Sequence, residues 1–157
     1  MQSTHVEGPL SVALTNEHHR LDSLWSEVRT NLENDISAER IARLQVFKKE
    51  LRRHILDEEM TLFPDFEERT GMSGSGPTAV MRSEHRQLEA LIEELIKTLG
   101  PHGDTAQAIE QANALSFLMD SHDKKEERIL YPMMDRAFGE QKSSALLAKI
   151  SLSRRDS

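Results

Sequence analysis

The sequence predicts an all-α protein, an up-down-up-down antiparallel four-helix bundle followed by a short C-terminal helix. Three observations support this prediction. The 157 residues are rich in Leu, Glu, Ala and Arg and only 4% are aromatic, a composition typical of helices. Three polar or Gly-rich breaks divide the chain into four long segments. Within each segment, apolar residues recur at alternating steps of three and four, the period of a helix that buries one face.

The first pair of helices is predicted over residues 10–33 and 38–69, with a polar break near 31–39. In the first segment the inward face carries Leu14, Leu21 and Trp25, with a gap at position 18. Short connections between long helices make neighbours antiparallel, so these two segments should form a hairpin.

The second pair is predicted over residues 78–99 and 105–138, after a linker at 71–78 that contains three Gly, and with a further break at 100–105. Asp104 begins a capping-box pattern for the fourth helix. The inward face of this last segment is expected to continue through Ile129 and Met133. A short helix is expected near 140–150.

Two prolines, Pro64 and Pro132, stand where the second and fourth helices should continue. A proline inside a helix removes one backbone hydrogen bond and clashes with the preceding turn. The sequence therefore predicts a kink or a break after each of them.

Composition narrows the classes of function. The net charge of −7 and the pI near 5.5 argue against a general nucleic-acid surface, which needs a basic face. With no Cys, thiolate metal sites and cysteine nucleophiles are excluded. No 18-residue apolar run predicts a membrane span, and "MQSTHVEGPL" lacks the pattern of a secretory signal. We expect one domain over 1–157, in the cytoplasm.

The apolar face of every predicted helix is interrupted by a histidine, and two of the helices carry a Glu four residues later. Burying an imidazole costs free energy unless it is bonded, so four such histidines need a common explanation. A step of four residues leaves two side chains about 40° apart on a helix, so His and Glu can reach one point. The six residues are His18, His54, Glu58, His85, His122 and Glu126.

The pattern is also repeated along the chain. "HILDEEMTLFP" begins at His54 and "HDKKEERILYP" at His122, while "NEHHRLDSL" aligns with "SEHRQLEAL". Two similar hairpins related by a pseudo-two-fold axis would bring four imidazoles and two carboxylates into one core. This set suits a carboxylate-bridged pair of transition-metal ions, and imidazole together with carboxylate fits iron, manganese or zinc. The competing interpretation is a buried His–Glu hydrogen-bond network that only holds the helices in register.

Neighbouring acids extend the set of candidates. Glu89 and Asp22 each follow an inward histidine by four residues, so both face the predicted site, and Glu89 is long enough to be a further ligand. Glu59 and Glu127 are either hydrogen-bond partners of histidines or surface acids. Glu84 is expected to be solvated.

The order His18, His54-x-x-x-Glu58, His85, His122-x-x-x-Glu126 resembles the hemerythrin-like, or HHE cation-binding, domain over about residues 10–135. The resemblance implies a bundle around an oxo- or hydroxo-bridged non-haem di-iron centre, with the two Glu bridging and the four His as terminal ligands. The oxygen-carrying members have a His where this chain has Glu89, and a longer His-to-Asp spacing in the fourth helix. Reversible oxygen transport is therefore the least expected activity.

The resemblance implies a protein that binds or reacts with O2, peroxide or NO at an open iron position. Catalase-like turnover is one form of this function. The alternative is an oxygen- or redox-sensing or iron-handling module that acts through binding, without turnover. The expected partner is a small diatomic or peroxide ligand, with no nucleic acid or membrane, and the chain is a monomer or a dimer.

Overall fold

The computed structural model describes residues 7–34, 37–100 and 103–155, and within these ranges it contains helices and no strand. Two segments, labelled η, are π-helices. In chain order the elements are α1 (Pro9–Glu33), α2 (Ser37–Leu56), η1 (Asp57–Leu62), α3 (Phe63–Thr70), α4 (Pro77–Thr98), α5 (Thr105–Lys125), η2 (Glu126–Leu130) and α6 (Tyr131–Arg155).

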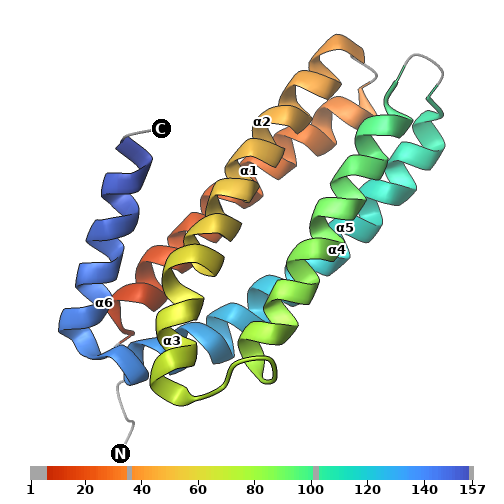
Figure 1. Ribbon diagram of the computed structural model, residues 1–157. Coiled ribbons are helices and arrows are strands. Elements are labelled where there is room, and N and C mark those ends of the chain that lie inside the picture. The colour runs from red at the N-terminus through yellow and green to blue at the C-terminus, as the bar shows by residue number, and fades with distance from the viewer. Residues whose placement is uncertain (1–6, 35–36, 101–102, 156–157) are drawn as a thin grey trace, which may run out of the picture.

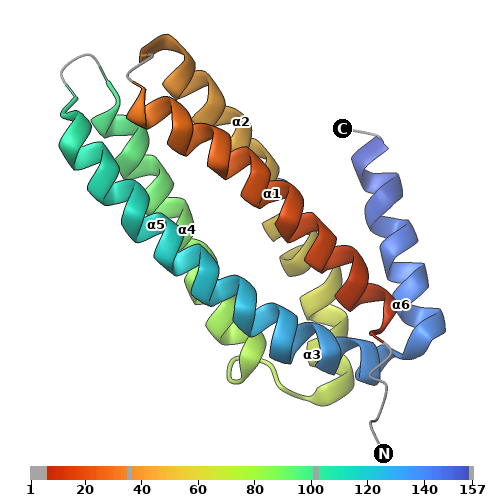
Figure 2. The ribbon, with the colours of Figure 1, turned by 180° about the vertical axis from the view of Figure 1, so that it is seen from behind.

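The helices form the predicted bundle. Two long hairpins, α1 with α2 and α4 with α5, lie side by side, and the C-terminal ends of α1 and α4 are at the same end of the molecule, called the loop end below (Figures 1 and 2). The loop between α3 and α4 crosses from one hairpin to the other at the opposite end. The expected cap of the fourth helix is present, because the Asp104 carboxylate accepts a hydrogen bond from the Ala106 amide at 2.9 Å.

The predicted C-terminal helix is present as the second part of α6. The chain turns at Gly139, whose φ of 79° is in the region that favours glycine. Beyond this turn the helix runs back along the outside of α1 (Figure 1). Asp135, just before the turn, accepts hydrogen bonds from the backbone amides of Leu10 and Ser11, and so caps the first turn of α1.

The two prolines change the helices differently from the sequence prediction. The α-helical pattern is interrupted before each proline, not after it, by the π-helices η1 and η2. Phe63 donates its backbone hydrogen bond to the Glu58 carbonyl, and Tyr131 donates to the Glu126 carbonyl, each five residues back. The wider π turn carries the chain past the proline while it stays helical.

The π-helix η2 also corrects the predicted inward face of the fourth helix. One extra residue in the turn rotates everything after it by about 100°. Ile129, expected to face inward, is 54% exposed, while Leu130 and Tyr131 are 1% and 0% exposed. The predicted inward face was therefore right up to Glu126 and wrong at Ile129, whereas Met133 is half-buried and packs against the core.

The histidines lie in a polar layer between two apolar clusters. One cluster fills the loop end of the bundle and includes Trp25, Phe47 and Leu115. The other lies under α6 and includes Phe63 and Tyr131. Among the described residues, no helix is long and apolar enough to cross a membrane.

Candidate metal centre

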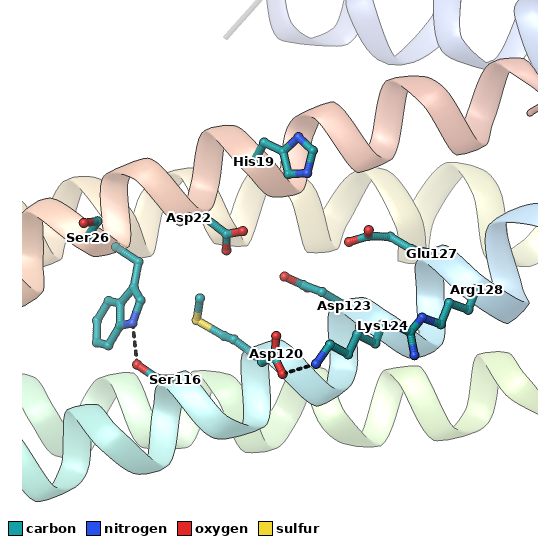
Figure 3. A pocket seen from close by; sticks show the side chains of 11 residues that line it. His19, Asp22, Ser26, Ser116, Asp120, Asp123, Lys124, Glu127 and Arg128 are labelled. Atoms are coloured by element: carbon teal, nitrogen blue, oxygen red, sulfur yellow. Dashed lines mark hydrogen bonds and ion pairs between the residues drawn. The ribbon is translucent and has the colours of Figure 1, made fainter.

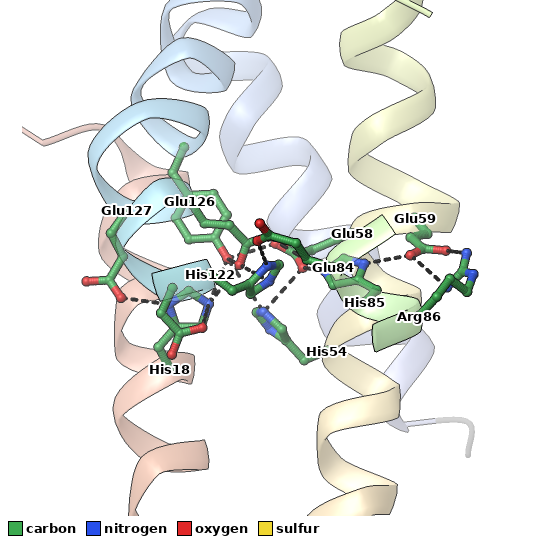
Figure 4. Close-up of polar contacts among 12 residues, drawn as sticks. His18, His54, Glu58, Glu59, Glu84, His85, Arg86, His122, Glu126 and Glu127 are labelled. Carbon is green, nitrogen blue, oxygen red and sulfur yellow. Dashed lines mark hydrogen bonds and ion pairs between the residues drawn. The ribbon is translucent and has the colours of Figure 1, made fainter. Parts of the chain in front are cut away.

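The structure brings six of the seven predicted ligands into one layer across the bundle. Each of the long helices contributes, and all six side chains are at most 3% exposed. They come from α1, from the end of α2 and the start of η1, from α4, and from the end of α5 and the start of η2 (Figure 4). The six residues are His18, His54, Glu58, His85, His122 and Glu126.

The ligand atoms fall into two groups that share one residue. Glu58, His85, His122 and Glu126 offer atoms that all lie within 4.8 Å of one another, as do His18, His54 and Glu126. The first group takes its histidines from the second hairpin, and the other group takes its histidines from the first. Two groups joined by the carboxylate of Glu126 have the arrangement that a bridged pair of cations requires.

The geometry follows the repeat in the sequence. The His18 and His54 rings meet edge to face with centroids 5.0 Å apart and planes at 64°. The His85 and His122 rings meet in the same way, at 4.9 Å and 63°. The two hairpins therefore present their histidine pairs to the core with the same local structure.

Three of the four histidines are held by a further carboxylate on the nitrogen that faces away from the centre. Glu127 lies 2.8 Å from Nδ1 of His18, and Glu59 lies 2.6 Å from Nδ1 of His85. Both contacts cross between hairpins, and they occupy equivalent positions in the repeat. This arrangement fixes the ring with Nε2 directed at the centre, as in carboxylate–histidine–metal triads.

The third carboxylate corrects a sequence prediction. Glu84, expected to be solvated, is 7% exposed and lies 2.9 Å from Nδ1 of His122. Lys125 pairs with the same carboxylate at 2.5 Å and keeps it charged. For His54, no partner of Nδ1 is present among the described residues.

Tyr131 is a residue of the centre that the sequence analysis missed. Its hydroxyl donates to Glu58 at 2.8 Å and is 3.0 Å from Glu126 and from Nε2 of His18. Tyr131 is the aromatic residue of "LYP" and corresponds to Phe63 in "LFP". This difference between the two copies of the repeat is the signal in the sequence that could have identified Tyr131.

Burial and charge shift the pKa values of the group in opposite directions. Burial lowers the pKa of His18 and His85, but the carboxylates of Glu126 and its neighbours outweigh this and raise both to about 10. Burial, and then the charge of Glu126, raise the pKa of Glu58 to about 8. Although burial opposes ionisation of Glu126 as well, the His122 charge holds its pKa well below the ordinary value.

Several polar atoms of this layer are left without a hydrogen-bond partner. They include Oε1 of Glu58, Nε2 of His85 and Oε2 of Glu126, in side chains that are 0% exposed. Nε2 of His85 lies 3.2 Å from Oε1 of Glu58 and 3.8 Å from Oε2 of Glu126, so these atoms are close together without making hydrogen bonds. A buried polar atom without a hydrogen bond costs free energy, so a network that served only to hold the helices together would be expected to provide one. Imidazole and carboxylate atoms oriented in this way fit divalent or trivalent transition-metal ions.

The remaining acidic candidates lie elsewhere. The side chain of Glu89 is 37% exposed and its nearest charged partner is Arg86 at 3.9 Å, so the structure does not bring it together with the six. It lines a surface pocket between α2 and α4. Asp22 is exposed and lines a different pocket, between α1 and α5.

Comparison with known proteins identifies one family. Its sequence model, described as Hemerythrin HHE cation binding domain, matches residues 10–134 and matches again over 76–149. The first match contains all six clustered residues, and the second begins at the second hairpin, as the internal repeat would produce. No curated protein and no solved structure gave a significant match.

Proposed function

The chain belongs to the hemerythrin HHE cation-binding domain family, and we propose that it holds two iron ions that react with O2, peroxide or NO. In this proposal the six clustered residues would hold the two ions, and Glu126 is the residue that belongs to both groups. Iron is proposed over zinc or manganese because of the family, since imidazole and carboxylate donors accept all three. When bound, the iron pair supplies the electrons for the chemistry.

The observation that carries the proposal is the convergence of buried imidazole and carboxylate atoms from the four long helices. Four imidazoles and two carboxylates meet in two groups that share Glu126, and atoms of both carboxylates lack hydrogen bonds. The outer carboxylates Glu59, Glu84 and Glu127 hold three of the rings in place. Such preorganisation is expected for a metal site, because it directs Nε2 inward before any cation binds.

The side chains around the centre have separate roles in this function. Tyr131 donates a hydrogen bond to Glu58 and is the one buried hydroxyl in contact with both carboxylates among the described residues. It can hold or supply a proton at the Glu58 oxygen. The apolar clusters on either side, with Phe63 stacked on His85 at 6.0 Å, exclude water from the layer.

Metal analysis combined with optical spectroscopy tests the proposal. The protein is loaded with ferrous iron without oxygen, and the bound iron is counted before O2, H2O2 and NO are added separately. We expect about two irons per chain, a number that follows from the two ligand groups, and a spectral change with at least one of the three. The variant His54→Ala should lose iron from the group that contains His18. A folded protein that binds no iron would refute the proposal.

A further inference from the structure

A pocket of about 460 Å3 opens on the surface between α1 and the α5–η2 segment. α1 contributes His19, Asp22 and Ser26 to its lining, and the opposite wall carries Asp123 and Glu127 (Figure 3). Asp22 points from α1 toward α5, and Asp123 points back toward α1. The pocket therefore separates the two hairpins at the level of the histidine layer.

The inner wall of this pocket touches the metal centre directly. Asp123 lies 3.5 Å from Nε2 of His18, the ring nitrogen that faces the other ligands. Glu127 holds Nδ1 of the same ring at 2.8 Å. His18 itself is 2% exposed, so these two carboxylates are the groups through which the pocket meets the centre.

The charges of the pocket favour a cation. Four acids line it, and one of its two basic side chains, Lys124, is engaged by Asp120 at 2.7 Å. By contrast, the charges of the pocket between α2 and α4 are balanced, with two acids, Glu89 and Glu93, and two basic side chains, Lys48 and Arg52. A cleft lined mainly by one sign of charge concentrates ions of the opposite sign and accelerates their capture.

A destination for the cation is independently present behind this wall. Oε2 of Glu126 is buried without a hydrogen bond, 3.8 Å from Nε2 of His85, and the other carboxylate oxygen, Oε1, lies 3.1 Å from Nε2 of His18. His18, Asp123 and Glu127 also offer atoms within 4.8 Å of one another, so a cation can be held there beside the centre. A path of oxygen and nitrogen ligands thus runs from the surface to the core.

We propose that this pocket is the entrance through which divalent cations reach the centre, and that the Asp123 carboxylate receives each cation and passes it to His18. This inference rests on the proposed function, because the centre must bind metal. It assigns Asp123 a role in loading, distinct from that of the six ligands.

Stopped-flow uptake of Co2+, followed by its absorption in the full-length chain, tests the entrance. The assay is run above the pKa of about 7 to which burial raises the Asp123 carboxyl, so that this group is charged. Asp123→Asn then keeps the shape and removes the charge, so uptake should slow by about tenfold while the final stoichiometry and spectrum stay unchanged. Asp65→Asn is the matched control, because that carboxylate pairs with Lys142 at 3.4 Å, outside the pocket. Its uptake rate should equal that of the unsubstituted protein.

A second measurement blocks the pocket without changing its charge. The chain contains no Cys, so Ser26→Cys can be labelled with a bulky neutral maleimide at the pocket wall. Labelled Ser26→Cys should take up Co2+ about tenfold more slowly, and labelled Ser73→Cys, in the exposed loop after α3, at the normal rate.

The outcomes separate the two proposals. Unchanged uptake in both Asp123→Asn and labelled Ser26→Cys would overturn the entrance and leave the metal centre intact. If Asp123→Asn takes up Co2+ at the normal rate but gives an altered final spectrum, Asp123 is a permanent ligand, and the proposed entrance is overturned as well. No uptake by the unsubstituted protein would overturn the proposed function together with the entrance.

Discussion

The carboxylates behind the histidines should control metal affinity, and Glu59 gives the sharpest test. Its oxygen lies 2.6 Å from Nδ1 of His85, the ring is 0% exposed, and Glu59 itself is 12% exposed. Replacing it by Gln keeps the size and removes the charge that makes the imidazole a stronger donor. Changes of this kind typically reduce metal affinity by about 10- to 100-fold, or about 1.4–2.8 kcal/mol.

The structure predicts a smaller loss of metal affinity at Glu127, the equivalent position of the repeat, than at Glu59. Glu127 makes a longer contact, 2.8 Å, and is 30% exposed, so water screens its charge more strongly. We expect Glu59→Gln to approach about 100-fold and Glu127→Gln about 10-fold, within the range for such partners. Competition with a chromophoric chelator under anaerobic conditions measures both affinities. Glu68→Gln, an exposed position on α3, is the control for net charge. Equal affinities in all three variants would refute the argument that the outer carboxylates tune the donors.

Three further predictions concern protons, the tyrosine and the turn before α6. Protein stripped by a chelator should lose stability as the pH rises from about 6.5 to 10, above the range in which the lowered pKa values of His54 and Glu126 act in the opposite direction. On folding, the pKa values of His18 and His85 rise from 6.5 to about 10 and that of Glu58 rises from 4.5 to about 8. The folded state therefore binds more protons than the unfolded state in this range, and raising the pH favours unfolding. Urea midpoints measured across the range test this prediction. Tyr131→Phe should lower the free energy of unfolding by about 1–3 kcal/mol, because it removes the buried donor to Glu58, and urea titration against Phe117→Leu, an exposed control, measures this. Gly139→Ala should destabilise the fold by about 1 kcal/mol, because φ there is 79°, and an unchanged melting temperature would contradict this.

The sequence was sufficient to predict the bundle and the grouping of six candidate ligands, because both depend on the same helical period. His18 and His85 fill positions of an apolar stripe, and the His-to-Glu step of four residues keeps each pair on one face. The structure confirms the bundle and brings these side chains together. Glu89 follows His85 by the same four residues, yet its side chain reaches solvent and lies beside Arg86. The spacing of residues determines which face of a helix they share, but not the direction that each side chain takes.

The limits of prediction arise where the helical period changes. Pro64 and Pro132 were expected to break the helices, whereas the π turns before them add a residue and shift the face that follows. That shift brings Tyr131 into the centre and turns Ile129 outward. Glu84 was misplaced for another reason, because its burial depends on Lys125 and His122 from a neighbouring helix.

The two halves of the centre are alike in their ligands and different in their surroundings. Each hairpin supplies a histidine pair with the same ring geometry. At equivalent positions, however, Phe63 stacks on His85 while Tyr131 places a hydroxyl 3.0 Å from His18. Asp123 and the acidic pocket also adjoin His18. The group that contains His18 therefore has an acidic pocket beside it, and under the proposed entrance an incoming cation should meet it first. The repeat in the sequence builds the pair of sites, and the substitution of Phe by Tyr makes them inequivalent.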